Sequence, residues 1–220
     1  MENWPAEPSP DCRLCERLVE FRTANVRDHP GWFNAPVPSF GDPGARLLVV
    51  GLAPGLQGAN KTGRPFTGDY AGDLLYATLA KFGLSKGVYA ANANDGLSLH
   101  DCMITNAVRC VPPQNKPVGA EMGNCRPFLT ERIRQLPNLV SILALGRIAH
   151  DNTLASFGYK KSAYAFAHGA EHELENGLTL HDSYHCSRYN TNTGRLTTEM
   201  FESVFEQITD RLRKSRSSRV

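Results

Sequence analysis

The segment RLLVVG at residues 46–51 is a short apolar run that ends at a glycine and leads into a polar, glycine-rich stretch. A continuous apolar run of this length, closed by a turn residue, is typical of a β-strand buried on both faces. Three further strands are expected at residues 103–106, 139–145 and 179–183, and each also leads into glycine or polar residues. The sequence therefore predicts four buried strands.

Amphipathic segments separate these strands. Strands that alternate with helices indicate a parallel sheet covered on both faces. We therefore expect an α/β fold of three layers, α/β/α, with a short parallel central sheet. The expected helices cover residues 12–25, 73–82, 122–135, 148–157 and 199–213, the first of them capped by Asp11.

Length and composition bound the organisation of the chain. Its 220 residues suffice for one large domain, which we expect over residues 1–213, with the basic residues 214–220 as a disordered tail. The formal net charge of +2 does not indicate a nucleic-acid binder, so any affinity for DNA must come from local clusters of Arg and Lys. The chain shows neither a membrane-spanning apolar run nor the pattern of a signal peptide. We expect a cytoplasmic monomer with no membrane contact.

Parallel sheets of this kind bind their ligands beyond the carboxyl ends of the strands. Each predicted strand runs into a polar loop at that end. The sequence therefore predicts where a site lies before it indicates what the site does. The four loops cover residues 51–68, 106–117, 146–147 and 185–194.

Two pairs of cysteines are candidate metal ligands. Cys12 and Cys15 form a CxxC segment, and Cys110 and Cys125 form a second, wider pair. Four thiolates hold either a tetrahedral zinc ion or a [4Fe–4S] cluster, and their spacing alone does not distinguish the two. Because the CxxC lies in a polar segment, metal ligation is favoured over four buried, hydrophobic thiols.

The other two cysteines, Cys102 and Cys186, have no partner nearby in the sequence and are expected to be buried thiols. A redox protein built on the CxxC is a further reading. It fails because no thioredoxin-like context surrounds that segment.

Two of the strand-end loops carry groups suited to ligand binding. GLAPG at residues 51–55 and TGRPFTGD at residues 62–69 are dense in glycine, which lets the backbone approach a ligand closely, although a plain connecting loop is also possible. The segment HCSRYNTNTGR at residues 185–195 offers an imidazole, hydroxyls, amides and two guanidinium groups. A lone histidine is often structural, but this mixture suits a phosphodiester backbone beside a polarised carbonyl.

Together these loops resemble the uracil-DNA glycosylase superfamily, and most closely its family 5, the type B enzymes. The resemblance runs from about Cys12 to Leu212. It rests on the two glycine-rich motifs, TNAVRC at residues 105–110, H-x-S at residues 185–187 and NTNTGRL at residues 190–196. The four cysteines match the ligands of a [4Fe–4S] cluster in families 4 and 5, so the resemblance implies iron–sulfur rather than zinc.

The resemblance implies a monofunctional DNA glycosylase with a uracil-DNA glycosylase-like fold. Such an enzyme flips uracil and other deaminated bases, such as hypoxanthine, out of double-stranded DNA and excises them, which starts base excision repair. Flipping is required because the glycosidic bond is hidden inside the stack. The protein would then be associated with the nucleoid through DNA.

The resemblance also implies roles for individual residues. His185 would hydrogen-bond the base carbonyl, Asn106 would read the base edge with its amide, and Phe66 would stack on the flipped base. The expected pocket floor is the backbone at Leu52, Ala53, Pro54 and Gly55, and the expected contacts to phosphates or to the gap left by the base are Ser187, Arg188, Asn190 and Thr193.

The residue that directs the attacking water is the remaining assignment. Other branches of the superfamily carry an acidic or amide side chain in the first motif, whereas this chain has Leu52, Ala53 and Pro54 there, which is the mark of family 5. We nominate Asp69 as the catalytic carboxylate, with Asp73 as the competitor. A helix N-cap is the alternative role for Asp69.

Two alternatives remain for the whole chain. A family 4 enzyme with a narrower uracil preference is disfavoured by the missing acid in the first motif. A catalytically silent protein that binds damaged DNA is disfavoured by His185, Asn106 and Asp69, because a pure binder needs no polar groups aimed at a glycosidic bond.

Overall fold

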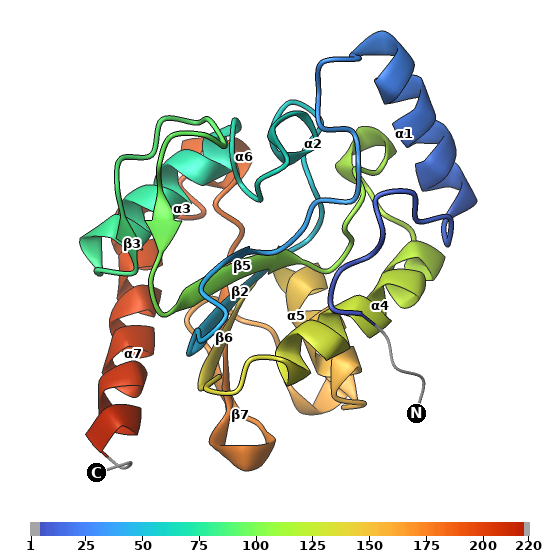
Figure 1. Ribbon diagram of the computed structural model, residues 1–220. Coiled ribbons are helices and arrows are strands. Elements are labelled where there is room, and N and C mark those ends of the chain that lie inside the picture. Colours follow the sequence, from blue (N-terminus) through green and yellow to red (C-terminus); the bar gives the residue numbers. More distant parts are fainter. Residues whose placement is uncertain (1–4, 218–220) are drawn as a thin grey trace.

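The computed structural model describes residues 5–217 and has three layers, with a central sheet between two layers of helices (Figure 1). The order of the strands across the sheet is β1-β5-β2-β6-β8-β7. This architecture confirms the predicted fold class, and the four predicted strands are its centre. The six strands are β1 (Phe40–Gly41), β2 (Leu47–Gly51), β5 (Cys102–Asn106), β6 (Ser141–Leu145), β7 (Glu171–Glu173) and β8 (Thr179–Ser183).

The four central strands are parallel and in register. β2 pairs with β5 on one side and with β6 on the other, and β6 pairs with β8. Gly51 lies opposite Asn106, so these two strands end side by side. The sequence did not predict the two short edge strands, β1 and β7, which pair antiparallel with β5 and β8.

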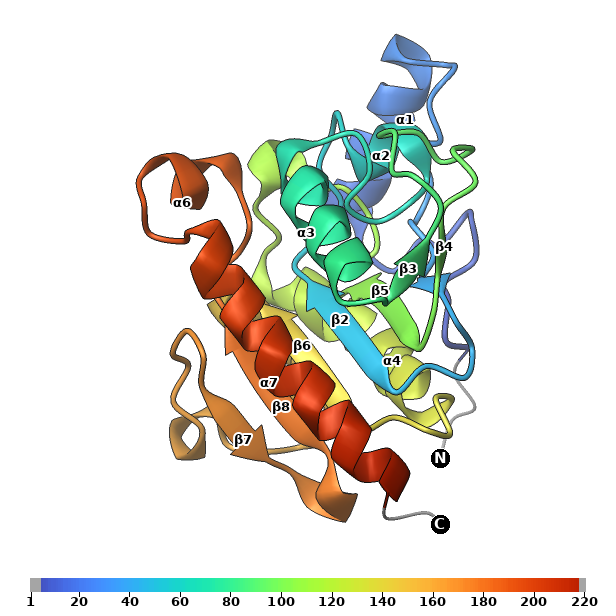
Figure 2. The same cartoon turned by 90° about the vertical axis from the view of Figure 1, so that its left-hand side faces the viewer.

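Helices cover both faces of the sheet and bury a separate hydrophobic core on each (Figure 2). Residues of α3 and α7 pack against one face, and residues of α4 and α5 pack against the other. The central strands are buried at every position, as their continuous apolar pattern indicates. The long helices are α1 (Glu16–Asp28), α3 (Tyr70–Lys81), α4 (Gly119–Arg134), α5 (Arg147–Ser156) and α7 (Thr198–Ser217).

The two ends of the chain differ from the sequence predictions. α1 begins only at Glu16, with Cys15 as its N-cap, so Asp11 does not cap it. Cys12 and Cys15 therefore lie ahead of the helix, where the chain turns toward Cys110 and Cys125. α7 continues through Ser217, so the predicted tail cannot begin at residue 214, and residues 218–220 lie outside the described residues.

Short elements occupy the predicted loops. The first glycine-rich loop contains α2 (Ala59–Thr62), and the loop after β8 contains α6 (Arg188–Asn192). Over the described residues, no helix is long and apolar enough to cross a membrane. The remaining short elements are the hairpin strands β3 (Ser85–Lys86) and β4 (Ser98–Leu99) and the 3-10 turns η1 (Pro113–Asn115), η2 (Lys161–Ala163) and η3 (Glu175–Gly177).

Candidate active site

A pocket of about 290 Å³ lies at the carboxyl ends of the parallel strands. Its walls come from the loop after β2, the end of β5, the start of α3 and the segment after β8. This is the position that the loop pattern predicted. The lining residues are Leu52, Ala53, Pro54, Gly55, Ala59, Phe66, Asp69, Ala71, Asn106, Asn115, His185 and Ser187.

Asn106 ends β5 and turns its amide over Gly51 toward the pocket. The side chain is 3% exposed, yet its Oδ1 accepts no hydrogen bond from any described residue. A buried amide oxygen without a donor is costly. A Cβ at position 51 would collide with both the Asn106 amide and the Phe66 ring, so only glycine permits this arrangement. The site thus holds an acceptor that a ligand can satisfy.

His185 lies just beyond β8 and lines the same pocket as Asn106. Asn190 fixes its backbone, because the Asn190 amide donates to the His185 carbonyl at 2.8 Å. The imidazole stacks against Phe66 with ring centroids 6.0 Å apart. Burial lowers the pKa of His185 to about 4. The ring is therefore neutral at physiological pH and carries one N–H donor and one acceptor nitrogen.

Asp69 has two roles in this structure. It is the N-cap of α3, where Oδ1 accepts the Gly72 N–H at 3.2 Å, and it also lines the pocket. Its other oxygen packs against Gly55 and Gly58. Burial raises the pKa of Asp69 above its ordinary value, although the amides of Gly72 and Ala71 partly oppose that shift. Asp73 is exposed and does not line this pocket, so Asp69 is the carboxylate at the site.

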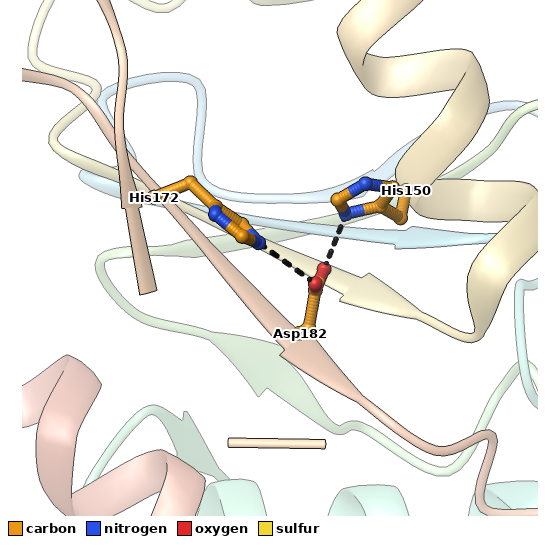
Figure 3. Close-up of side chains that lie close together, drawn as sticks. All are labelled: His150, His172 and Asp182. Atoms are coloured by element: carbon orange, nitrogen blue, oxygen red, sulfur yellow. Dashed lines mark hydrogen bonds and ion pairs between the residues drawn. The ribbon is translucent and has the colours of Figure 1, made fainter. Parts of the chain in front are cut away.

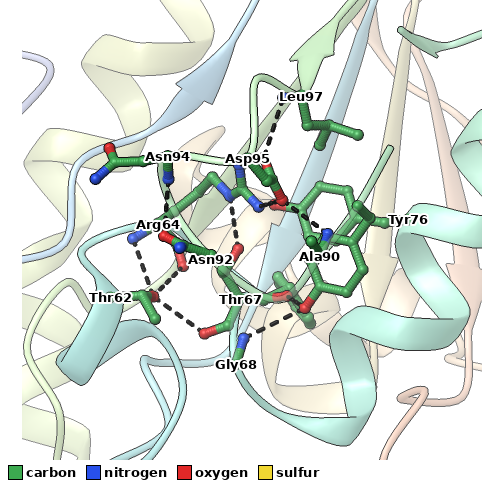
Figure 4. A network of polar contacts seen from close by, with 12 residues as sticks. Thr62, Arg64, Thr67, Gly68, Tyr76, Ala90, Asn92, Asn94, Asp95 and Leu97 are labelled. Carbon is green, nitrogen blue, oxygen red and sulfur yellow. Dashed lines mark hydrogen bonds and ion pairs between the residues drawn. The ribbon is translucent and has the colours of Figure 1, made fainter. Parts of the chain in front are cut away.

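A buried ion pair holds the loop that carries Phe66 and Asp69 (Figure 4). The guanidinium of Arg64 donates to both carboxylate oxygens of Asp95 at 2.7 Å and to Thr67 Oγ1 at 2.7 Å. Three aromatic rings, those of Phe40, Tyr76 and Tyr89, lie within 5.7 Å of it.

The ring neighbours of Arg64 also hold the backbone beside it. The Tyr76 hydroxyl donates to the Pro65 carbonyl, and the Tyr89 hydroxyl donates to the Phe66 carbonyl. Phe66 adopts a φ of 52°, which is unfavourable for an aromatic residue. Strain of this kind persists only where surrounding contacts impose it, and here it turns the Phe66 ring into the pocket.

Loss of the Arg64–Asp95 pair should destabilise the protein strongly. We expect Arg64→Met to lower the free energy of unfolding by about 3 kcal/mol or more, because it leaves Asp95 buried without its partner. Adding Asp95→Leu to that variant should recover much of the loss. Urea denaturation measures both. The matched control is Arg213→Met, which breaks the exposed pair with Asp210 and should cost less than about 1 kcal/mol. Equal losses for Arg64→Met and Arg213→Met would contradict this account.

Four residues were expected to contact phosphates or the gap left by the flipped base, and three of them do not line the pocket. Ser187 lines it and caps α6, whereas Arg188 borders a neighbouring depression and stacks over Tyr70 at 5.3 Å. The Asn190 amide is directed at His185 rather than outward. Thr193 lies at the exposed end of α6, where its hydroxyl donates to the Tyr189 carbonyl. The role expected for these residues stays a prediction.

Exposed arginines and aromatic rings occur in the segments that follow β6 and β8. Arg147 and Arg195 are exposed, and each stacks on an aromatic ring, Arg147 on Phe166 at 5.5 Å and Arg195 on Tyr184 at 4.6 Å. Arg188 in α6 is exposed as well. Tyr189, which sequence reasoning missed, is 72% exposed on α6.

Sequence reasoning also missed three lining residues, Ala59, Ala71 and Asn115. Asn115 closes the loop after β5 and has a φ of 56°. Its place in a strand-end loop after two prolines was the available signal. The two alanines gave none, because a small apolar residue looks the same whether it lines a pocket or packs in a core.

The four predicted cysteine ligands come together on the far side of the Leu52–Ala53 loop. All four line one small depression, and Leu18, Val108 and Phe128 pack around them. Two donors reach the sulfurs: Arg22 contacts Cys110 Sγ at 3.6 Å, and Asn124 contacts Cys15 Sγ at 3.6 Å. By contrast, Cys102 and Cys186 are fully buried free thiols, as predicted.

Ala53 links the two sites. It lines the pocket with one side and packs against the cysteine group with the other. A rearrangement of the four cysteines would therefore move Ala53 and change the shape of the pocket floor.

Comparisons with known proteins agree with this geometry. A sequence profile described as the Uracil DNA glycosylase superfamily matches residues 38–209. The chain is 49% identical to the type-5 uracil-DNA glycosylase of Thermus thermophilus, over 88% of this chain and 90% of that protein. It is 42% identical to the type-5 enzyme of Mycobacterium leprae, over 88% of each chain. It is 30% identical to the type-4 uracil-DNA glycosylase of Sulfurisphaera tokodaii, over 89% of this chain and 79% of that protein.

Proposed function

Because the chain belongs to the uracil DNA glycosylase superfamily, we propose that it hydrolyses the N-glycosidic bond of uracil in DNA, with the residues of the pocket as its catalytic groups. The two type-5 relatives share more identity with the chain than the type-4 relative does, which supports the family 5 reading.

The observation that carries this proposal is the arrangement of three polar groups around one apolar pocket. Asn106 presents an unsatisfied acceptor, His185 presents a neutral imidazole, and Asp69 presents a carboxylate. Cleavage of the glycosidic bond produces an anionic base and a cationic sugar, so these groups match the charges that develop.

Each group has a defined task in the reaction. Oδ1 of Asn106 accepts the imide N–H of uracil, and its NH₂ donates to a neighbouring carbonyl. The His185 N–H donates to the carbonyl oxygen on which negative charge accumulates, and a neutral donor transfers no proton prematurely. Asp69 orients a water toward the sugar carbon and stabilises the developing cation. Phe66 stacks on the base.

Double-stranded DNA is the partner that we propose. Arg147, Arg188 and Arg195 are exposed in the segments that follow β6 and β8, and such cations suit contacts to phosphates. Each guanidinium stacks on an aromatic ring, which limits its mobility before DNA binds. Exposed Tyr189 is suited to enter the duplex beside the flipped nucleotide. We propose that Ser187, Asn190 and Thr193 shape the rim of the pocket.

Activity on a second deaminated base follows from the pocket floor. Leu52 and Ala53 bring no charged side chain to it, and a site with few polar groups rejects other bases weakly. We expect the purified protein to leave alkali-sensitive sites in labelled duplexes that contain uracil and also in duplexes that contain hypoxanthine. An undamaged duplex of the same sequence is the control. Cleavage of the uracil duplex alone would contradict the broad scope, and cleavage of neither would contradict the proposed function.

We propose that Cys12, Cys15, Cys110 and Cys125 hold a [4Fe–4S] cluster. Four free thiols around one depression, with two N–H donors directed at the sulfurs, suit a thiolate-bound group. Sulfurs around one tetrahedral zinc ion lie about 3.8 Å apart, because each Zn–S bond is about 2.3 Å long. No three of these four sulfur atoms, all in described residues, lie within 4.8 Å of one another. This wider spacing favours a polynuclear cluster over a single zinc ion. Such a cluster would brace α1 against Ala53 and the pocket floor.

Metal analysis tests the cluster. Freshly purified protein should be brown and contain iron and sulfide in nearly equal amounts. Cys12→Ala should bleach the protein and lower its melting temperature, because the bound cluster contributes to folding. Cys102→Ala, which removes a buried thiol that does not line the depression, is the matched control and should keep its iron. A colourless protein that contains zinc would exclude the iron–sulfur cluster without affecting the proposed glycosylase activity.

A further inference from the structure

A second group of metal-binding side chains lies away from the pocket and from the cysteines. His150 of α5, His172 of β7 and Asp182 of β8 come together on the face of the sheet that α4 and α5 cover (Figure 3). One donor atom from each lies within 4.8 Å of the other two. The proposed glycosylase reaction uses none of these residues.

The contacts within the group place three metal-binding donors around one point. His150 Nδ1 lies 2.7 Å from one oxygen of Asp182, and His172 Nε2 lies 3.1 Å from the other. Each contact is satisfied either by a proton on the ring nitrogen or by a cation bound between the two atoms. One divalent cation among the three donors would satisfy both contacts at once.

The surroundings of the group are those of a metal site. His150 Nε2 lies 3.0 Å from the Tyr164 carbonyl, so this nitrogen donates a proton, and in the neutral ring Nδ1 can then bind a metal. A backbone carbonyl that fixes the tautomer of a ligating histidine in this way is common in metal sites. The ring of Phe166 packs edge-on against His150, and the ring of Tyr164 packs edge-on against His172. These two rings limit the access of water.

Spacing and donor type favour zinc. Zinc bonds to imidazole nitrogen and carboxylate oxygen are about 2.0–2.2 Å long, which sets tetrahedral donors about 3.3 Å apart. The contact of 2.7 Å would therefore lengthen by about 0.6 Å and that of 3.1 Å by about 0.2 Å. Calcium and magnesium prefer oxygen donors, whereas two imidazoles and one carboxylate suit zinc. The side chains of His150 and Asp182 are at most 1% exposed and that of His172 is 14% exposed, so a water can complete the tetrahedron from the side of His172.

We propose that His150, His172 and Asp182 form a zinc-binding site. The ion would join α5 and the edge strand β7 to β8, the strand that leads into Tyr184 and His185. Its role is structural, and the proposal does not depend on the glycosylase activity.

Metal binding by variants tests the site. The holoprotein is dialysed against excess zinc and then against metal-free buffer, and bound zinc is measured by mass spectrometry. Wild type should retain about one zinc more than His172→Gln or His150→Gln. Glu171→Gln, which changes the exposed neighbour of His172 on the same strand, is the matched control and should bind like wild type. Zinc should raise the melting temperature of wild type and of the control, but not that of the two histidine variants.

Cobalt distinguishes this site from the cysteines. Cobalt bound by the three residues should give visible d–d bands without the thiolate-to-cobalt charge-transfer band that cysteine ligation produces. The proposal is overturned if wild type retains no more zinc than His172→Gln, or if the cobalt that wild type binds shows thiolate ligation only.

Discussion

Replacing Asp69 by Asn should reduce the single-turnover rate of uracil excision by about two to three orders of magnitude, because it removes the carboxylate that we propose directs the water and faces the sugar cation. Asparagine caps a helix nearly as well as aspartate, so α3 should stay folded and the melting temperature should change little. Rapid-quench assays on a uracil duplex measure the rate, and thermal melts measure the fold.

Asp73→Asn is the matched control for this substitution. Asp73 lies one turn further along α3, is exposed and borders the neighbouring depression rather than the pocket. Its substitution should leave the rate within a few-fold of wild type. An unchanged rate for Asp69→Asn together with a collapsed rate for Asp73→Asn would show that the wrong carboxylate was chosen. An unchanged rate for both would leave Asp69 with its capping role alone.

The second large effect concerns His185. His185→Ala should lower the single-turnover rate by about two to three orders of magnitude, which is the usual cost of removing one donor to a developing oxyanion. Affinity for a duplex that contains uracil should change much less, because phosphate contacts dominate it. Fluorescence anisotropy at fixed salt measures the affinity. A loss of binding as large as the loss of rate would make His185 a binding residue instead.

The pH dependence of the wild-type rate checks the same assignment. The pKa of His185 is lowered to about 4, so the ring stays neutral as the pH falls through the ordinary histidine value of 6.5. The pKa of Asp69 is raised above 3.8, so its carboxylate is lost as the pH falls through that higher value. The rate should therefore be nearly flat from about pH 8 to pH 6 and should decline only at lower pH. A decline centred near 6.5 would show that His185 titrates as an exposed imidazole.

Local sequence determined much of the fold and the position of the site. Strands buried on both faces are usually apolar, so β2 could be recognised from the continuous apolar run at residues 46–51, whereas β8 is buried although most of its residues are polar. Because parallel strands end at one edge, the loops after them had to meet, and nine of the twelve predicted catalytic and DNA-binding residues line the pocket there. The family motifs supplied roles that periodicity cannot give.

The carboxylate at the site was decided only by tertiary structure. Asp69 and Asp73 are four residues apart, and a helical pattern would place them on the same side. However, Asp69 precedes the helix with extended backbone angles (φ −130°, ψ 164°), so its side chain points into the pocket while that of Asp73 faces outward. The start of a helix depends on how the preceding loop packs, and here the Arg64–Asp95 pair holds that loop.

Sequence alone determined the four central strands, the long helices between them and the loops that form the site, because burial leaves a recognisable pattern in neighbouring residues. Tertiary structure decided which distant side chains meet. The partners Arg64 and Asp95 lie 31 positions apart, and His150 and Asp182 lie 32 apart. Such pairs leave no periodic trace, because their contact depends on how whole elements pack and not on the spacing of residues along one of them.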